Sequence, residues 1–149
     1  MEIIDYTREL IPEVMDFERR MREEEPFYGW DIDEAYRKRV DASFDDPRFA
    51  NAVSLLAWED GKVTGRIDGS ILASRFDGTV NGYLDWICVV KSSRHAGTAQ
   101  ALLAELRRRM KQAGAAQLIA LMAANEEAQR FYRAVEGASI HDEGIWIDL

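Results

Sequence analysis

The chain has 149 residues, of which 47% are hydrophobic and 31% are charged, and this composition is typical of one soluble globular domain over residues 1–149 and excludes a disordered chain. Its 27 acidic and 19 basic residues give a formal net charge of −8. That excess argues against nucleic acid and anionic membrane surfaces as partners, and it suits a cationic ligand such as an amine. With one cysteine, Cys88, and two histidines, His95 and His141, neither an internal disulfide nor a metal site is expected.

Two further features indicate a cytoplasmic protein. The longest uncharged run, from Gln112 to Asn125, is shorter than a membrane-spanning helix requires. The segment Met1–Asp5 is acidic and lacks the basic and then apolar plan of a signal peptide.

The spacing of apolar residues predicts the elements in chain order. A strand is expected over 2–6, followed by a helix from Leu10 to about 25 and a second helix, capped by Asp31 or Asp33, that ends near 45. The apolar spacing then changes to that of strands, and three strands are expected at 52–58, 63–74 and 80–90. A helix at 99–113 and a strand at 117–122 follow. The last elements expected are a helix from Asn125 to Gly137 and a strand at 139–149, broken at 143–144.

This order, β-α-α-β-β-β-α-β-α-β with a further terminal strand allowed, predicts an α+β fold with a mixed central sheet in three layers. The first three long strands form an antiparallel meander. The unit from 80 to 122 is expected to be a right-handed parallel strand-helix-strand crossover.

Residues 83–99 carry the chemistry. An apolar strand leads through small and basic residues directly into a helix, so loop amides and the helix N-terminus direct their N–H groups at one spot that suits phosphate or pyrophosphate. Gly97 allows close approach, Ala99 is small, and Arg94 adds a positive charge. The loop has neither a Gly-Lys-Ser/Thr triplet nor three spaced glycines. The alternative is a tight strand-to-helix turn with no ligand.

The run Arg94–Ala99 resembles the Arg/Gln-x-x-Gly-x-Gly/Ala signature of the GNAT superfamily, the Gcn5-related N-acetyltransferases. Asn125, followed by Phe131 and Tyr132, resembles the second landmark of that family, and the order of elements matches over essentially the whole chain. From Tyr83 onward the chain is most similar to small-molecule members, including aminoglycoside 3-N-acetyltransferases.

The resemblance implies acetyl-CoA (coenzyme A) as co-substrate, no metal, and transfer of acetyl to a primary amine, expected on a small molecule, by direct attack in a ternary complex. A backbone amide of the central strand is expected to polarise the thioester carbonyl. The cofactor-binding residues that it implies are Ile87, Cys88, Val89, Arg94, His95, Ala96, Gly97, Thr98, Ala99, Asn125 and Tyr132.

Tyr132 is the expected general acid. A phenol within reach of the sulfur can protonate the departing thiolate, because the pKa values of the two groups, about 10 and about 8.5, are close. The alternative is that Tyr132 only packs beside Phe131.

Asp85 is the expected base or ammonium anchor. Strand alternation predicts that it shares a face with Tyr83 and Ile87, and a carboxylate in an apolar strand needs a reason because its burial is costly. The alternative is an aspartate on the still-exposed first half of the strand.

An acidic and aromatic cluster between the first two helices is expected to border the amine acceptor, since aromatic rings and carboxylates bind ammonium groups well. The alternative is a solvated loop. Its members are Glu23, Glu24, Glu25, Phe27, Tyr28, Trp30, Asp31 and Asp33.

Three positions depart from the family pattern. Gly137 follows Tyr132 by five residues where four are usual, Ala96 replaces a common glycine or basic residue, and Tyr83 stands near the position of the glutamate base of histone-type members. These departures leave two alternatives open, a catalytically silent module that binds CoA or a protein, and a protein or peptide N-acetyltransferase. A homodimer is compatible with the sequence.

Overall fold

The computed structural model describes residues 1–25, 30–141 and 144–148. The chain divides into two compact units, residues 1–119 and 120–149, and each is described by itself. The single domain expected from the chain length stays a prediction.

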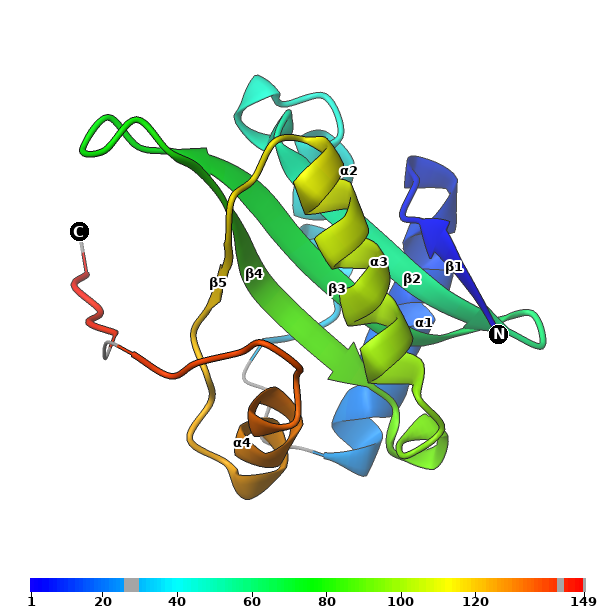
Figure 1. The fold of residues 1–149 in the computed structure, drawn as a ribbon. Coiled ribbons are helices and arrows are strands. Elements are labelled where there is room, and N and C mark those ends of the chain that lie inside the picture. Colours follow the sequence, from blue (N-terminus) through cyan, green and yellow to red (C-terminus); the bar gives the residue numbers. More distant parts are fainter. Residues whose placement is uncertain (26–29, 142–143, 149) are drawn as a thin grey trace. The chain divides into compact units, whose positions relative to one another are not determined.

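The first unit holds most of the secondary structure (Figure 1). Local signals mark where its helices begin and end. The Asp33 side chain caps the start of one helix by accepting a hydrogen bond from the Tyr36 N–H at 2.8 Å, and Gly114, at φ 86°, follows the end of the last helix of this unit. Its helices are α1 (Ile11–Glu24), α2 (Glu34–Ser43) and α3 (Thr98–Gln112), its strands are β1 (Glu2–Asp5), β2 (Ala52–Glu59), β3 (Lys62–Ala73), β4 (Val80–Val89) and β5 (Leu118–Ala120, whose last residue opens the second unit), and its short 3₁₀ turns are η1 (Arg8–Leu10), η2 (Pro47–Phe49) and η3 (Lys91–Ser93).

The strands form one mixed sheet in the order β1-β2-β3-β4-β5. The first four run antiparallel to their neighbours. The segment entering β5 runs in the same direction as β4, because the Ala116 N–H donates to the Val80 carbonyl at 2.9 Å and the Gly82 N–H donates to the Gln117 carbonyl at 2.8 Å. The mixed sheet and the α+β class predicted from the sequence are confirmed.

Helices cover both faces of the sheet (Figure 1). Helix α3 lies on one face, where Leu102, Leu106 and Met110 contact sheet glycines that leave room for them. Helices α1 and α2 lie on the other face, and the core there consists mainly of α1 residues packed on β2 and β4: Val14, Phe17, Met21, Leu56 and Cys88. Three layers are therefore present, as predicted.

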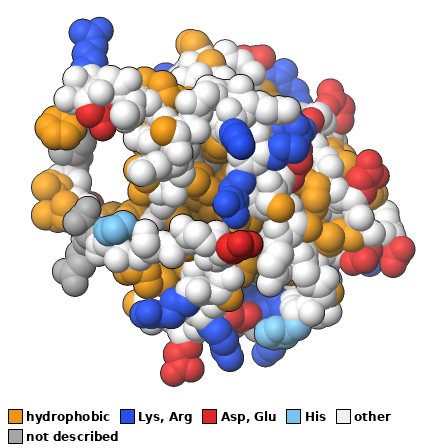
Figure 2. Space-filling model, in the orientation of Figure 1, with side chains coloured by type: hydrophobic (Ala, Val, Ile, Leu, Met, Phe, Trp, Pro, Cys, Tyr) orange, Lys and Arg blue, Asp and Glu red, His pale blue; other side chains and the backbone are white. Residues whose placement is uncertain are grey.

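Basic side chains gather on the last turns of α3 (Figure 2). Arg108 and Arg109 both pair with Glu105, at 2.6 Å and 2.8 Å, and Arg109 also reaches Asp5 at 3.1 Å. Cations at a helix C-terminus complement its dipole, so this cluster has a structural explanation.

Strand β4 contains a bulge at Asp85. Asp68 pairs with Trp86, whereas Gly69 pairs with Leu84, so Asp85 is an extra residue without an opposite partner. Ile87 pairs with Ile67 on the α3 face, and Tyr83 lies on the opposite face because its neighbour Gly82 faces Met110. The prediction that Tyr83, Asp85 and Ile87 share a face is wrong, since the bulge breaks the alternation.

The second unit contains α4 (Glu126–Arg133), and Gly137 follows it at φ 77°. No strand forms in the described residues 139–141 and 144–148, so the expected last strand is not observed there, and Glu143, where a break was expected, lies outside the described residues. Ile145, Trp146 and Ile147 are consecutive rather than alternating apolar residues. A strand also needs a partner edge that tertiary structure supplies.

Gly69→Ala is expected to destabilise the fold more than Gly82→Ala. A Cβ at Gly69 would lie 2.6 Å from the Tyr83 backbone oxygen, next to the bulge, whereas a Cβ at Gly82 would meet only side-chain atoms, the nearest at 3.0 Å on Met110. Overpacking typically costs about 1–3 kcal/mol, and a flexible methionine can relieve part of it. Urea unfolding of both variants measures the difference, and equal losses would show that the backbone contact is not limiting.

Candidate active site

The loop between β4 and α3 is built as the sequence indicates. After η3, His95 adopts φ 62° and Gly97 adopts φ 85°, and this left-handed backbone turns the chain into α3. Gly97 is the N-cap and has no side chain to satisfy the amides of the first helical turn. His95, Ala96 and Gly97 are exposed, while Thr98 is buried and donates from its hydroxyl to the Ser93 carbonyl at 3.4 Å.

The loop can accommodate a phosphate-bearing ligand. A Cβ added at Gly97 would meet no other atom within 4 Å, so the space above this residue is open. Uncapped amides at a helix N-terminus bind anions through their N–H groups and the helix dipole. A diphosphate site at this loop, as opposed to a tight turn without a ligand, stays a prediction.

Arg94 is engaged within the protein. Its guanidinium pairs with Glu25, through Nη1 and Oε1 at 2.9 Å and through a closer contact of Nη2 with Oε2, and its Nε donates to the Val89 carbonyl at 3.1 Å. The hydrogen bond from Arg94 lowers the pKa of the Glu25 carboxyl. Nearby, the Lys91 N–H donates to Glu24 Oε2 at 2.6 Å. Two members of the predicted acceptor cluster, Glu24 and Glu25, thus contact the loop instead.

Asp85 lies exposed at the bulge of β4. Partial loss of solvation raises the pKa of its carboxyl, and the carboxylate of Asp68 raises it further against the opposing effect of Arg66. A carboxylate with a raised pKa that still reaches solvent is suited to accept a proton. The bulge explains why a charged residue is tolerated within an apolar strand.

The three β4 residues after the bulge pair regularly with β3. Ile87, Cys88 and Val89 lie opposite Ile67, Arg66 and Gly65. Cys88 and Val89 are buried, so Cys88 acts as a core residue and these two positions can offer only backbone groups to a ligand, whereas Ile87 is partly exposed.

A buried ionic cluster beside Asp85 was not foreseen from the sequence. Glu18 is 2% exposed, and it accepts from Arg22 at 2.6 Å and from Arg66 at 3.3 Å. Arg66 also pairs with Asp68 at 2.6 Å, and the Asp68 carboxylate accepts from the Ser54 hydroxyl at 2.7 Å. The sequence contains a signal for this cluster, a charged residue on the apolar stripe of α1: Glu18 lies four residues after Val14 and three before Met21.

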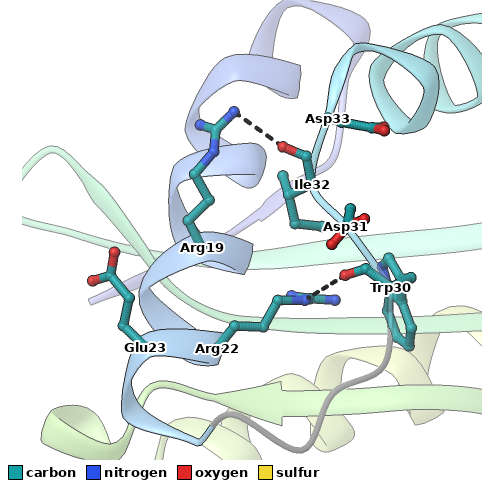
Figure 3. Close-up of a pocket in the computed structure, with 7 residues that line it drawn as sticks. All are labelled: Arg19, Arg22, Glu23, Trp30, Asp31, Ile32 and Asp33. Atoms are coloured by element: carbon teal, nitrogen blue, oxygen red, sulfur yellow. Dashed lines mark hydrogen bonds between the residues drawn. The ribbon is translucent and has the colours of Figure 1, made fainter.

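A pocket of about 590 Å³ opens beside this cluster (Figure 3). The Arg22 guanidinium lies 4.6 Å from the centre of the Trp30 ring and donates to the Trp30 carbonyl at 3.2 Å, while Trp30 and Trp86 meet edge to face at 5.7 Å. The lining residues are Arg19, Arg22, Glu23, Trp30, Asp31, Ile32 and Asp33.

The predicted acidic and aromatic character of the acceptor region therefore describes only some of the residues that line the pocket. Glu23, Trp30, Asp31 and Asp33 line the pocket, but two arginines, which the sequence did not single out, lie with them. Phe27 and Tyr28 lie outside the described residues.

Asn125 and Tyr132 belong to the second unit. The Asn125 side chain accepts from the Ala128 N–H at 2.8 Å and so caps α4, and the rings of Phe131 and Tyr132 meet edge to face at 5.2 Å. Capping explains an asparagine at this position by itself. The cofactor roles of both residues stay predictions.

Neither a metal site nor a membrane-spanning helix is present in the described residues, 1–25, 30–141 and 144–148. No group of three or more His, Cys, Asp or Glu side chains is placed to hold a metal ion. No helix in this part of the chain is long and apolar enough to cross a membrane.

Solved structures with the same fold are numerous. An aminoglycoside acetyltransferase, meta-AAC0020, from an uncultured soil metagenomic sample superposes with a TM-score of 0.81 at 13% identity, over 99% of this chain and 95% of that chain. The aminoglycoside 6′-N-acetyltransferase AAC(6′)-IG from Acinetobacter haemolyticus gives 0.77 at 16% identity, over 100% and 98%. The ribosomal-protein-alanine N-acetyltransferase from Brucella melitensis biovar Abortus 2308 gives 0.75 at 17% identity, over 99% and 100%.

At these identities the likeness shows the fold alone, and no curated protein sequence gives a significant match. The decisive comparison is with a family profile, described as the acetyltransferase (GNAT) family, which matches residues 12–136. That match spans β4, the loop around Gly97, α3 and α4, and it confirms the resemblance to the GNAT superfamily that the sequence indicates. The chain belongs to the GNAT family of acetyltransferases.

Proposed function

We propose that this protein transfers an acetyl group from acetyl-CoA to a primary amine of a small molecule, by direct attack within a ternary complex. The observation that carries the proposal is the open, uncapped helix N-terminus at Gly97, in a chain of the acetyltransferase family. We further propose that the protein acts in the cytoplasm.

The loop supplies the binding site for the diphosphate of the co-substrate. The backbone N–H groups of residues 96–99 are proposed to bind it, since they belong to the turn at Gly97 and to the first helical turn, whose N–H groups have no partner within the helix. Arg94 supplies positive charge once its contact with Glu25 opens. Asn125 and Tyr132 are proposed to contribute from the second unit.

The chemistry requires two proton transfers. The amine nitrogen forms a bond to the thioester carbonyl carbon, the carbon–sulfur bond breaks, the amine loses a proton and the thiolate gains one. Asp85 is proposed to take the amine proton, directly or through a water, since its raised pKa makes its carboxylate a better base than an ordinary aspartate. Tyr132 is proposed to protonate the sulfur, and a backbone N–H within Ile87–Val89 to polarise the carbonyl.

The pocket beside α1 is the proposed acceptor site. Glu23, Asp31 and Asp33 offer carboxylates to an ammonium group, and Trp30 offers an aromatic face. Two of the similar structures are those of aminoglycoside acetyltransferases, which supports a small-molecule amine as the acceptor. A similar ribosomal-protein-alanine acetyltransferase makes a protein amine the second candidate. Thiol release from acetyl-CoA, compared for aminoglycosides, polyamines and alanine-ended peptides, separates the two.

Gly97→Glu should abolish the stabilisation of the protein by acetyl-CoA. The new side chain places bulk and negative charge in the open space where the diphosphate is proposed to bind. A ligand present at a hundred times its Kd stabilises the native state by about 2.7 kcal/mol, which a thermal unfolding scan detects. Gly78→Glu is the matched control, because Gly78 has a similar φ of 74° and equally open surroundings at the β3–β4 turn. Equal ligand-induced shifts in both variants would exclude the loop as the binding site.

Tyr132→Phe should lower kcat far more than it weakens acetyl-CoA binding. The change removes only the hydroxyl, so the ring contact with Phe131 persists. General acid catalysis contributes roughly 10²–10⁴-fold, and a loss within that range is expected in a thiol-release assay. Unchanged turnover would leave Tyr132 with a packing role only.

Asp85→Asn should lower turnover and raise stability at the same time. Loss of a general base costs roughly 10²–10⁴-fold, and the loss should be largest at the acid end of the range from pH 6 to 9, where the amine is most protonated. Because folding raises the pKa of Asp85, its ionised form destabilises the native state, so the variant should melt higher than the wild type at pH 7. This gain should vanish below the unfolded pKa of about 3.9.

Asp60→Asn, at the β2–β3 turn, removes the same charge and serves as the control. A silent Asp85→Asn variant across this pH range would assign the base to another group.

A further inference from the structure

Helix α1 ends in three glutamates, and negative charge at this end is unfavourable for the helix itself. Glu23 and Glu24 occupy its last turn and Glu25 follows as the C-cap. The C-terminus of a helix carries a partial negative charge, so carboxylates there are destabilising unless something else compensates them. Arg22, in the same turn, is engaged by Glu18 and Trp30.

The compensation comes from the loop between β4 and α3, where the diphosphate of acetyl-CoA is proposed to bind. Glu24 Oε2 accepts from the Lys91 N–H at 2.6 Å, and Glu25 binds the Arg94 guanidinium with both oxygens, the Nη1–Oε1 contact measuring 2.9 Å. The side chains of Arg94 and Glu25 are only 16% and 18% exposed, so this ion pair is largely shielded from solvent. The loop thus already holds two anionic groups of its own chain.

We infer that Glu25 is an internal anion that competes with the diphosphate of acetyl-CoA for Arg94, so that binding of the co-substrate must open the Glu25–Arg94 pair. The inference rests on the proposed function for the identity of the ligand. The geometry leads to it: Arg94 directs Nη1 and Nη2 at Glu25 and Nε at the Val89 carbonyl, so an outside anion can take the Nη1–Nη2 fork only if the carboxylate leaves it.

A positioning role for Glu25 would give the opposite result. A carboxylate that holds Arg94 ready for the ligand would make binding weaker when it is removed. A carboxylate that competes would make binding tighter, because it releases Arg94 and removes negative charge beside the loop. The hydrogen bond from Arg94 lowers the pKa of Glu25, so the carboxylate is ionised at neutral pH and competes there in full.

The test is calorimetric titration of coenzyme A into the full chain as wild type, Glu25→Gln and Glu23→Gln. We expect Glu25→Gln to lower Kd by about tenfold, which corresponds to about 1.4 kcal/mol. Glu23→Gln removes the same charge from the same helix end, but its exposed side chain lines the pocket, so the variant should change Kd by less than about twofold, as expected for a screened charge. An unchanged or higher Kd for Glu25→Gln would overturn the inference while leaving the proposed function intact.

A second variant covers the case in which Glu25→Gln does not fold. Glu24→Gln removes the carboxylate from the Lys91 amide and leaves the Glu25–Arg94 pair in place. It should also lower Kd, by less than Glu25→Gln, and an unchanged or raised value would count against competition at this loop. If wild type and every folded variant fail to bind coenzyme A, the proposed function is overturned and this inference with it.

Discussion

One buried carboxylate ties α1 to the sheet, in addition to the apolar residues of the helix. Glu18 lies between α1 and β3 and is held by Arg22 from its own helix and by Arg66 from the strand. Removing one partner of a buried ion pair typically costs about 3–5 kcal/mol, because the remaining charge is left without compensation. The same helix carries the pocket residues Arg19, Arg22 and Glu23 and ends at the glutamates that contact the loop before α3, so this ion pair helps to hold both in place.

The same cluster joins the proposed base and the proposed acceptor pocket, both of which belong to the first unit. Arg22 extends from Glu18 to the Trp30 ring and carbonyl in the pocket, and Arg66 extends from Glu18 to Asp68, which raises the pKa of Asp85. The proposed base and the proposed acceptor pocket are therefore linked through ionic contacts that lie under the sheet surface. A buried network of this kind favours a single arrangement of its members, since any other leaves a charge unpaired.

The sequence predicted the helices and strands of the first unit and the strand-loop-helix passage at Gly97 because both depend on local patterns. Apolar spacing, the Asp33 cap and the glycine before α3 act within a few residues of chain, and the structure confirms them. The features that it did not predict depend on contacts between distant segments. The bulge at Asp85 arises from the register between β3 and β4, and the Glu25–Arg94 pair joins residues 69 positions apart. The last strand was expected from composition alone, without a partner edge.

Chemical-shift mapping tests most directly whether the loop before α3 binds acetyl-CoA. In a ¹⁵N–¹H titration, we expect the largest shift changes at the amides of residues 96–99, around the open surroundings of Gly97. Changes at Ala96, Gly97, Thr98 and Ala99 that saturate with the ligand would support the proposed site. Saturable changes confined to other residues, or no changes at millimolar acetyl-CoA, would contradict it.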